Sequence, residues 1–151
     1  MKQLFLAAAL TAFPWASANA VDFNKDALKA MQQEGHKIVE EAEAGRPFKF
    51  RNLCLDTAGA KLVVKACNEK AASQKWRFDD QGRLVAHTGK CVAGAQLQNC
   101  GPGNVQKWHH DKKKRLVNAA KQCLEAEGDA PKAGARVAAV ACSDSPNQVW
   151  Q

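Results

Sequence analysis

The tripeptide Gln-x-Trp occurs three times in this 151-residue chain, and its regular spacing limits the folds that the chain can adopt. Each tryptophan follows a cysteine by eight or nine residues, and the first two also precede a cysteine by fifteen. Outside these tripeptides the only tryptophan is Trp15. The spacing therefore predicts three equivalent units, each of which places one large apolar side chain in a shared core. The three copies are Gln74–Trp76, Gln106–Trp108 and Gln148–Trp150.

The six cysteines lie between positions 54 and 142, and an even number of them is typical of an oxidising compartment. They form no Cys-x-x-Cys pair, and the four histidines do not complete a zinc-site spacing. The sequence therefore predicts disulfides, with no metal and no cofactor. Six cysteines allow fifteen pairings, and the repeat favours those within one unit. The expected disulfides are Cys54–Cys67, Cys91–Cys100 and Cys123–Cys142.

Residues 1–20 have the pattern of a secretory signal peptide. Lys2 is followed by the apolar run Leu4–Phe13 and by the small-residue sequence Ala18-Asn19-Ala20. This run is shorter than the roughly 20 apolar residues that cross a bilayer as a helix, and the alternative is a buried N-terminal helix. No later stretch is long and apolar enough to span a membrane. We expect cleavage after Ala20 and a secreted or periplasmic mature protein.

Residues 22–44 are predicted to form an amphipathic helix that begins at an N-cap, Asp22 or Asn24, and ends at Gly45-Arg46-Pro47. We expect this helix to lie on its own domain. Contact with a partner protein or with a second copy of the chain are the alternatives. The apolar stripe consists of Leu28, Met31, Gly35, Ile38 and Ala42.

From Phe48 onward the chain consists of short apolar runs separated by turn sequences, which predicts an all-β domain. The chain then divides into the signal peptide, a helix with its linker at 21–46, and a β domain at 47–151. The helical segment has four basic and six acidic residues, whereas the β domain has seventeen basic and nine acidic. The expected strands include 48–50, 61–65, 77–78, 83–85 and 136–140.

Four sequence elements together resemble the ricin B-type lectins. They are the motif Cys54-Leu55-Asp56, a second cysteine, the Gln-x-Trp tripeptide and the turn Gly82-Arg83-Leu84-Val85. The resemblance covers residues 48–151, about two thirds of the chain, in all three repeats. It implies a β-trefoil with pseudo-threefold symmetry, disulfides within each repeat, the three repeat tryptophans in the core, and carbohydrate as the ligand.

The resemblance also implies where a sugar would bind in each repeat. An acid lies two residues after the first cysteine, an aromatic residue lies about two before the second, and an asparagine precedes the Gln-x-Trp glutamine. No repeat of this chain has all three. The residues at these positions are Asp56, Lys65 and Ser73 in the first repeat, Ala93, Gln98 and Val105 in the second, and Glu125, Val140 and Asn147 in the third.

The first and third repeats are therefore the candidate sugar sites, and the second has lost the constellation. The alternative is that the acids are turn or surface carboxylates and the glutamines are structural. The candidate carbohydrate-binding residues are Asp56, Gln74, Glu125, Asn147 and Gln148.

A basic run occupies the turn that follows the second Gln-x-Trp, where we expect a hairpin tip. It is either a solvated turn or an anion site for a sulfated or phosphorylated glycan, an acidic protein or lipid headgroups. No aromatic groove accompanies it, so we expect no specific nucleic-acid binding. The candidate anion-binding residues are Lys112, Lys113, Lys114 and Arg115.

Nothing in the sequence indicates an enzyme. The common hydrolase, metalloprotease and phosphate-loop motifs are missing, and Asp79-Asp80 and His109-His110 have no inferable catalytic partners. The sequence predicts a non-catalytic, lectin-like carbohydrate-binding module with partly degenerate sugar sites. The alternative is a protein–protein adaptor or toxin-accessory subunit that uses the helix or the basic tip and has lost sugar binding.

Overall fold

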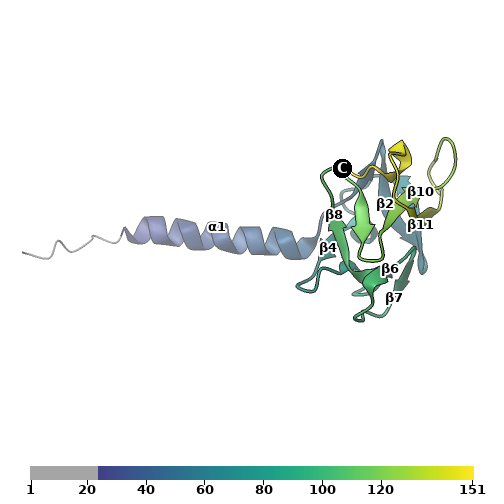
Figure 1. Cartoon of the computed structure of the whole chain (residues 1–151). Coiled ribbons are helices and arrows are strands. Elements are labelled where there is room, and N and C mark those ends of the chain that lie inside the picture. The colour runs from purple at the N-terminus through teal and green to yellow at the C-terminus, as the bar shows by residue number, and fades with distance from the viewer. Residues whose placement is uncertain (1–23) are drawn as a thin grey trace, which may run out of the picture.

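The computed structural model describes residues 24–151, so the predicted signal peptide and the cap Asp22 lie outside the described residues. These residues form one α-helix followed by short antiparallel strands and three single-turn helices (Figure 1). In chain order the elements are α1 (Lys25–Ala44), β1 (Lys49–Phe50), β2 (Leu53–Ala58), β3 (Lys61–Ala66), η1 (Ala72–Gln74), β4 (Trp76–Phe78), β5 (Leu84–Ala86), β6 (Cys91–Ala93), β7 (Gln96–Gln98), η2 (Asn104–Gln106), β8 (Trp108–His110), β9 (Leu116–Asn118), β10 (Gln122–Ala126), β11 (Val137–Ala141) and η3 (Pro146–Gln148).

Helix α1 begins at the second of the two predicted caps. The side chain of Asn24 accepts hydrogen bonds from the backbone N–H groups of Asp26 and Ala27, at 3.0 and 3.3 Å. The helix extends away from the β domain, and the side chains of residues 24–38 are exposed (Figure 1). The expectation that the helix lies on its own domain is therefore wrong.

The direction of α1 is set where the chain joins the β domain. Gly45 has a φ of +74°, and a Cβ there would lie 3.0 Å from the backbone N and O of Trp76. Arg46 then pairs with Trp76, with N–H···O distances of 2.8 and 3.0 Å. These contacts hold the C-terminal end of α1 against β4. The helix extends from that end into solvent, so its apolar stripe does not pack on the strands.

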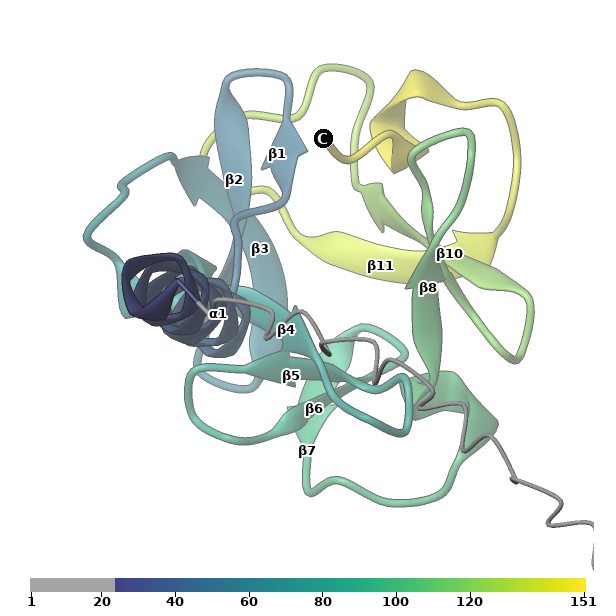
Figure 2. The same cartoon turned by 90° about the vertical axis from the view of Figure 1, so that its left-hand side faces the viewer.

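The strands form two sheets, ordered β1-β2-β3-β7-β6-β5-β4 and β11-β10-β9-β8, in which all neighbours are antiparallel. Eight of these strand pairs join strands that are consecutive in the chain, and the ninth joins β3 to β7. The two ends of the domain form one further backbone pair. In that pair Lys49 and Gln151 exchange backbone hydrogen bonds of 2.7 and 2.8 Å. Viewed along α1, the strands form three lobes (Figure 2). The predicted strand at Arg83–Val85 is shifted by one residue, because Arg83 instead forms a bridge with Lys107.

The three repeats use their tryptophans in the same way. Trp76, Trp108 and Trp150 are 1%, 3% and 0% exposed, and they belong to one hydrophobic core. Each indole N–H donates to the carbonyl of the residue after the first cysteine of its repeat, Leu55, Val92 or Leu124, at 3.0, 2.8 and 3.0 Å. A buried indole N–H needs such a partner, so these bonds allow the rings to fill the core. The predicted β-trefoil of three equivalent repeats is confirmed.

The disulfides close within the repeats, as the repeat predicted. Cys54 pairs with Cys67, Cys91 with Cys100 and Cys123 with Cys142.

Candidate functional site

The Gln-x-Trp glutamines make the same two backbone hydrogen bonds in every repeat. Each Oε1 accepts from a backbone N–H just after the second cysteine, and each Nε2 donates to the carbonyl of the residue before that cysteine. All three glutamines are buried, so they hold the end of each hairpin in place. The accepted bonds come from Asn68, Gly101 and Ser143 at 2.8, 2.7 and 2.8 Å, and the donated bonds go to Ala66, Asn99 and Ala141 at 2.9, 3.0 and 3.0 Å.

The second Nε2 hydrogen of each glutamine distinguishes the repeats. Gln74 donates it to Asp56 Oδ2 at 2.9 Å, and Gln148 donates it to Glu125 Oε2 at 2.8 Å. In the second repeat Ala93 occupies the acidic position, so that repeat offers no carboxylate. The structure therefore brings the predicted acid and glutamine together in the first and third repeats.

In the first repeat the carboxylate is fully engaged by the protein. Asp56 lies on β2 and is 2% exposed, so the alternative that it is a turn or surface carboxylate is wrong. Its Oδ1 accepts from the Thr57 N–H at 2.6 Å and lies 3.6 Å from Lys65 Nζ. Lys65 is opposite Cys54 in the β2–β3 pair, the position at which the resemblance places an aromatic residue. Lys65 Nζ also donates to the Thr57 carbonyl at 2.8 Å, and this bond holds the ammonium group beside the Asp56 carboxylate.

The ionisation of Asp56 reflects these contacts. Burial alone would raise its pKa, but hydrogen bonds from Gln74, the Thr57 backbone and Ser73, together with the Lys65 ammonium, lower the pKa below its usual value. A depression of about 570 Å³ lies beside Gln74 and the Cys54–Cys67 disulfide, but Asp56 does not line it. The first-repeat acid is thus ionised and satisfied within the protein.

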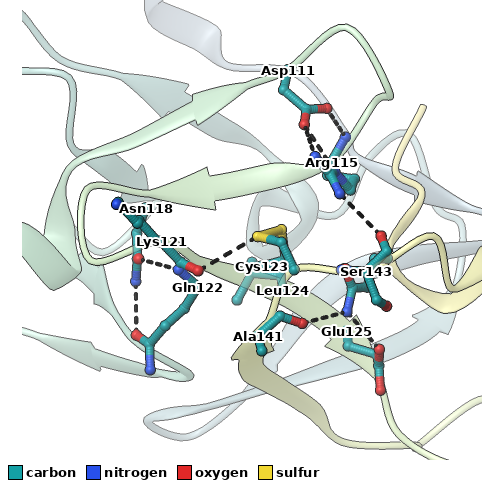
Figure 3. The surroundings of a disulfide bond; sticks show 12 residues. Asp111, Arg115, Asn118, Lys121, Gln122, Cys123, Leu124, Glu125, Ala141 and Ser143 are labelled. Carbon is teal, nitrogen blue, oxygen red and sulfur yellow. Dashed lines mark hydrogen bonds and ion pairs between the residues drawn. A yellow bond between two sulfur atoms is a disulfide. The ribbon is translucent and has the colours of Figure 1, made fainter.

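In the third repeat the carboxylate is partly available. Glu125 lies on β10 and is half-buried, and Gln148 holds its Oε2. Among the described residues, Oε1 has no hydrogen-bond partner. Figure 3 shows Glu125 and Ala141 on facing strands, joined by dashed lines to the same amide group. Val140, which pairs with Cys123 across the hairpin, shares the face of Glu125 because side chains alternate along strands.

Asn147 and Arg51 extend this third-repeat site. Asn147 Nδ2 donates to the Gly128 carbonyl at 2.8 Å, and Arg51 Nη2 donates to Asn147 Oδ1 at 3.4 Å. Arg51 comes from the β1–β2 turn of the first repeat, 96 residues away in the chain. Sequence reasoning missed Arg51, since a comparison of each repeat with the next carries no signal for a side chain contributed by another repeat.

The predicted basic tip is the turn between β8 and β9, and half of its cations are engaged. Arg115 contacts Asp111 at 2.8 Å and donates to the Ser143 carbonyl at 3.0 Å (Figure 3). Lys113 contacts Asp144 at 2.6 Å. Lys112 and Lys114 are exposed and have no ion pair among the residues the structure describes. The tip is thus attached to the Ser143–Asp144 segment, whose first N–H is held by Gln148.

Three repeats around one tryptophan core, with an acid–glutamine pair in two of them, define a β-trefoil protein of lectin type. The chain belongs to the ricin-type beta-trefoil lectin domain family, which it matches over residues 49–150. Similar solved structures include the designed 3-fold symmetric protein ThreeFoil, at 24% identity and a TM-score of 0.58, covering 70% of this chain and 94% of that one. The earthworm R-type lectin C-half in complex with GalNAc is 19% identical with a TM-score of 0.59, over 70% and 94% of the two chains. The agglutinin from Abrus precatorius is 14% identical with a TM-score of 0.64, over 71% of this chain and 45% of that one.

The disulfides and the lectin domain are consistent with an extracellular location. Across residues 24–151, no helix combines the length and the hydropathy needed to cross a bilayer.

Proposed function

We propose that the protein is an exported, non-catalytic carbohydrate-binding module whose working site is the third repeat. One observation carries this proposal: Gln148 fixes one oxygen of Glu125, while the other has no partner among the described residues. A carboxylate held in this way accepts hydrogen bonds from sugar hydroxyls without a further loss of side-chain freedom. Membership of a lectin family and the GalNAc bound by the earthworm lectin support this class of ligand.

The third-repeat site provides three kinds of contact to a sugar ring. Glu125 Oε1 accepts from hydroxyls, the second Nδ2 hydrogen of Asn147 donates to them, and Val140 offers an aliphatic surface. An aliphatic surface lacks the polarised face of an aromatic ring, so the ring contact contributes less free energy than stacking on an aromatic side chain. We therefore expect weak binding of a single sugar.

The basic tip adds a preference for acidic glycans. Lys112 and Lys114 lie on the turn attached to Ser143 and Asp144, next to the segment that positions Gln148. A sulfate or carboxylate on the glycan gains from these two cations.

A glycan array with the mature chain tests the proposal. Glu125→Gln retains the shape and the bond to Gln148 but replaces the free acceptor oxygen by a donor, and we expect it to abolish binding. Glu127→Gln is the matched control, because Glu127 is an exposed carboxylate just beyond β10, 4.0 Å from Arg136. If Glu125→Gln binds as well as the unmodified chain, the third repeat is not the site.

A protein contact through α1 is the second candidate function. The observation that favours it is the exposure of Leu28, Met31 and Ile38, at 44%, 71% and 63%, on a helix that extends away from the trefoil. The adaptor alternative predicts an array without hits together with a co-purifying protein.

Export is tested separately by sequencing the N-terminus of the mature protein, which we expect to begin at Val21.

A further inference from the structure

The strongest unexplained feature outside the sugar site is the apolar stripe of α1. Leu28, Met31 and Ile38 are exposed, although each would stabilise a structure by being buried. In proteins most of the stability of a helix comes from packing of its apolar face. The exposed stripe therefore indicates a partner that buries these side chains.

Gly35 indicates that the partner is a closely packed helix. It lies at the middle of α1 and within the stripe, where glycine costs a helix about 1 kcal/mol relative to alanine. The domain does not require this glycine, because a Cβ at position 35 would meet no atom within 4 Å. A second helix that crosses α1 at Gly35 can approach its backbone closely, because no side chain lies between the two helices.

We propose that α1 pairs in antiparallel orientation with α1 of a second copy of this chain, crossing at Gly35. In this arrangement Met31 of each copy lies opposite Ile38 of the other, on either side of the crossing. The stripe is then covered by an identical stripe, as a twofold interface requires.

The charges along α1 select the antiparallel orientation. Residues 25–31 contain two lysines and one aspartate, whereas residues 32–44 contain one lysine and four glutamates. An antiparallel pair places each cationic half beside an anionic half, while a parallel pair places the two anionic halves together. The helix dipoles also oppose one another in the antiparallel pair.

The trefoils favour the same orientation. A parallel pair would bring two domains, each with seventeen basic and nine acidic residues over 47–151, to the same end of the helices. An antiparallel pair places them at opposite ends of a rod about 30 Å long, the length of a 20-residue helix. If the third repeat binds sugar as proposed, such a dimer presents two sites and gains avidity on a glycan-covered surface. The pairing itself does not depend on sugar binding.

Sedimentation equilibrium on the mature chain tests the pairing. We expect a monomer–dimer equilibrium and helicity, measured by circular dichroism, that rises with protein concentration. The double variant Met31→Ala/Ile38→Ala removes apolar volume but retains helix propensity, and we expect its dimer dissociation constant to rise at least tenfold. Val105→Ala is the control, since Val105 is an apolar residue on the trefoil that is 40% exposed, and its dissociation constant should not change.

Cysteine cross-linking tests the orientation. All six native cysteines are in disulfides, so an introduced cysteine is the only free thiol. An equimolar mixture of Met31→Cys and Ile38→Cys chains should form mixed disulfide dimers well above the twofold excess over either homodimer that random pairing gives. Homodimers formed equally well by each variant alone would show a parallel pair. That result, a monomer at all concentrations, or a different protein bound to the stripe would each overturn the proposal.

Discussion

The Nζ atom of Lys65 lies 3.6 Å from Oδ1 of the buried Asp56, and this contact separates the first repeat from the third. Both repeats hold an acid through the Gln-x-Trp glutamine. In the first repeat a lysine occupies the position of the aromatic residue and binds the acid. In the third, Val140 occupies that position and cannot bind it. Lys65 thus covers the acid of the first repeat, whereas in the third repeat one oxygen of Glu125 has no partner among the described residues.

Replacing this lysine should open the first repeat. We expect Lys65→Tyr, in a Glu125→Gln background that removes the third site, to recover glycan binding in a titration with the best array ligand. The new ring would contribute about 1 kcal/mol, or about fivefold in affinity. Lys61→Tyr in the same background is the control, because it adds a ring to β3 away from Asp56. A folded Lys65→Tyr variant without binding would show that Lys65 is not what closes the site.

The glutamines should separate structural from binding roles. Gln106→Ala leaves the Gly101 N–H and the Asn99 carbonyl without their partner, so we expect a loss of about 2 kcal/mol in the free energy of unfolding. Glycan affinity should not change, because the second repeat has no acid. Gln148→Ala should cost similar stability and also lower affinity about tenfold or more by releasing Glu125. Urea unfolding and glycan titration measure both effects, and equal losses of affinity in the two variants would contradict this assignment.

The junction between α1 and the trefoil should be sensitive to a single methyl group. Gly45 and Gly89 have φ values of +74° and +77°, but a Cβ meets the Trp76 backbone at 3.0 Å only at Gly45. Gly89→Ala should cost about 1 kcal/mol for the backbone conformation alone. Gly45→Ala should cost at least about 1 kcal/mol more, because Gly45 combines its φ with a ψ of 170°, which essentially only glycine adopts, and because the strand contact must shift. Urea unfolding of the two variants tests this. Equal losses in the free energy of unfolding would mean that the backbone around Trp76 shifts to accept the methyl group without further destabilisation.

Acid should destabilise the fold partly through Asp56. Because its pKa is lower in the folded protein than the ordinary value of 3.8, the unfolded chain binds the proton more tightly. The stabilisation is therefore complete above the unfolded pKa and is lost as the pH falls through the folded pKa. Asp56→Asn should flatten the fall in melting temperature below about pH 4. Asp79 and Asp111 also have lowered pKa values, so part of the acid sensitivity should remain.

The basic tip should affect only acidic glycans. Lys112→Ala/Lys114→Ala should weaken binding of a sulfated glycan several-fold at low salt and leave a neutral glycan unaffected, since exposed charges are screened by salt. The double variant Lys70→Ala/Lys90→Ala, which removes two exposed lysines elsewhere, is the control. Titrations at two salt concentrations measure the effect, and a loss for the neutral glycan would place the tip inside the sugar site itself.

The sequence alone determined the repeat architecture. Three Gln-x-Trp tripeptides in register with six cysteines predicted three equivalent units around one core and a disulfide within each unit, and the resemblance to the ricin B-type lectins implied the trefoil. The helix and its cap at Asn24 also follow from local signals, since capping and apolar periodicity depend on neighbours within a few residues.

Only the tertiary structure decided which of the two candidate sites has a carboxylate oxygen without a partner among the described residues. Lys65 contacts Asp56 in the first repeat and Arg51 contacts Asn147 in the third, because strand pairing and threefold closure bring together side chains from different strands and from opposite ends of the domain. Gly45 directs α1 outward through a contact with Trp76, which lies 31 positions further along the chain. Such contacts depend on backbone distances in space, and the spacing of residues along the chain does not specify them.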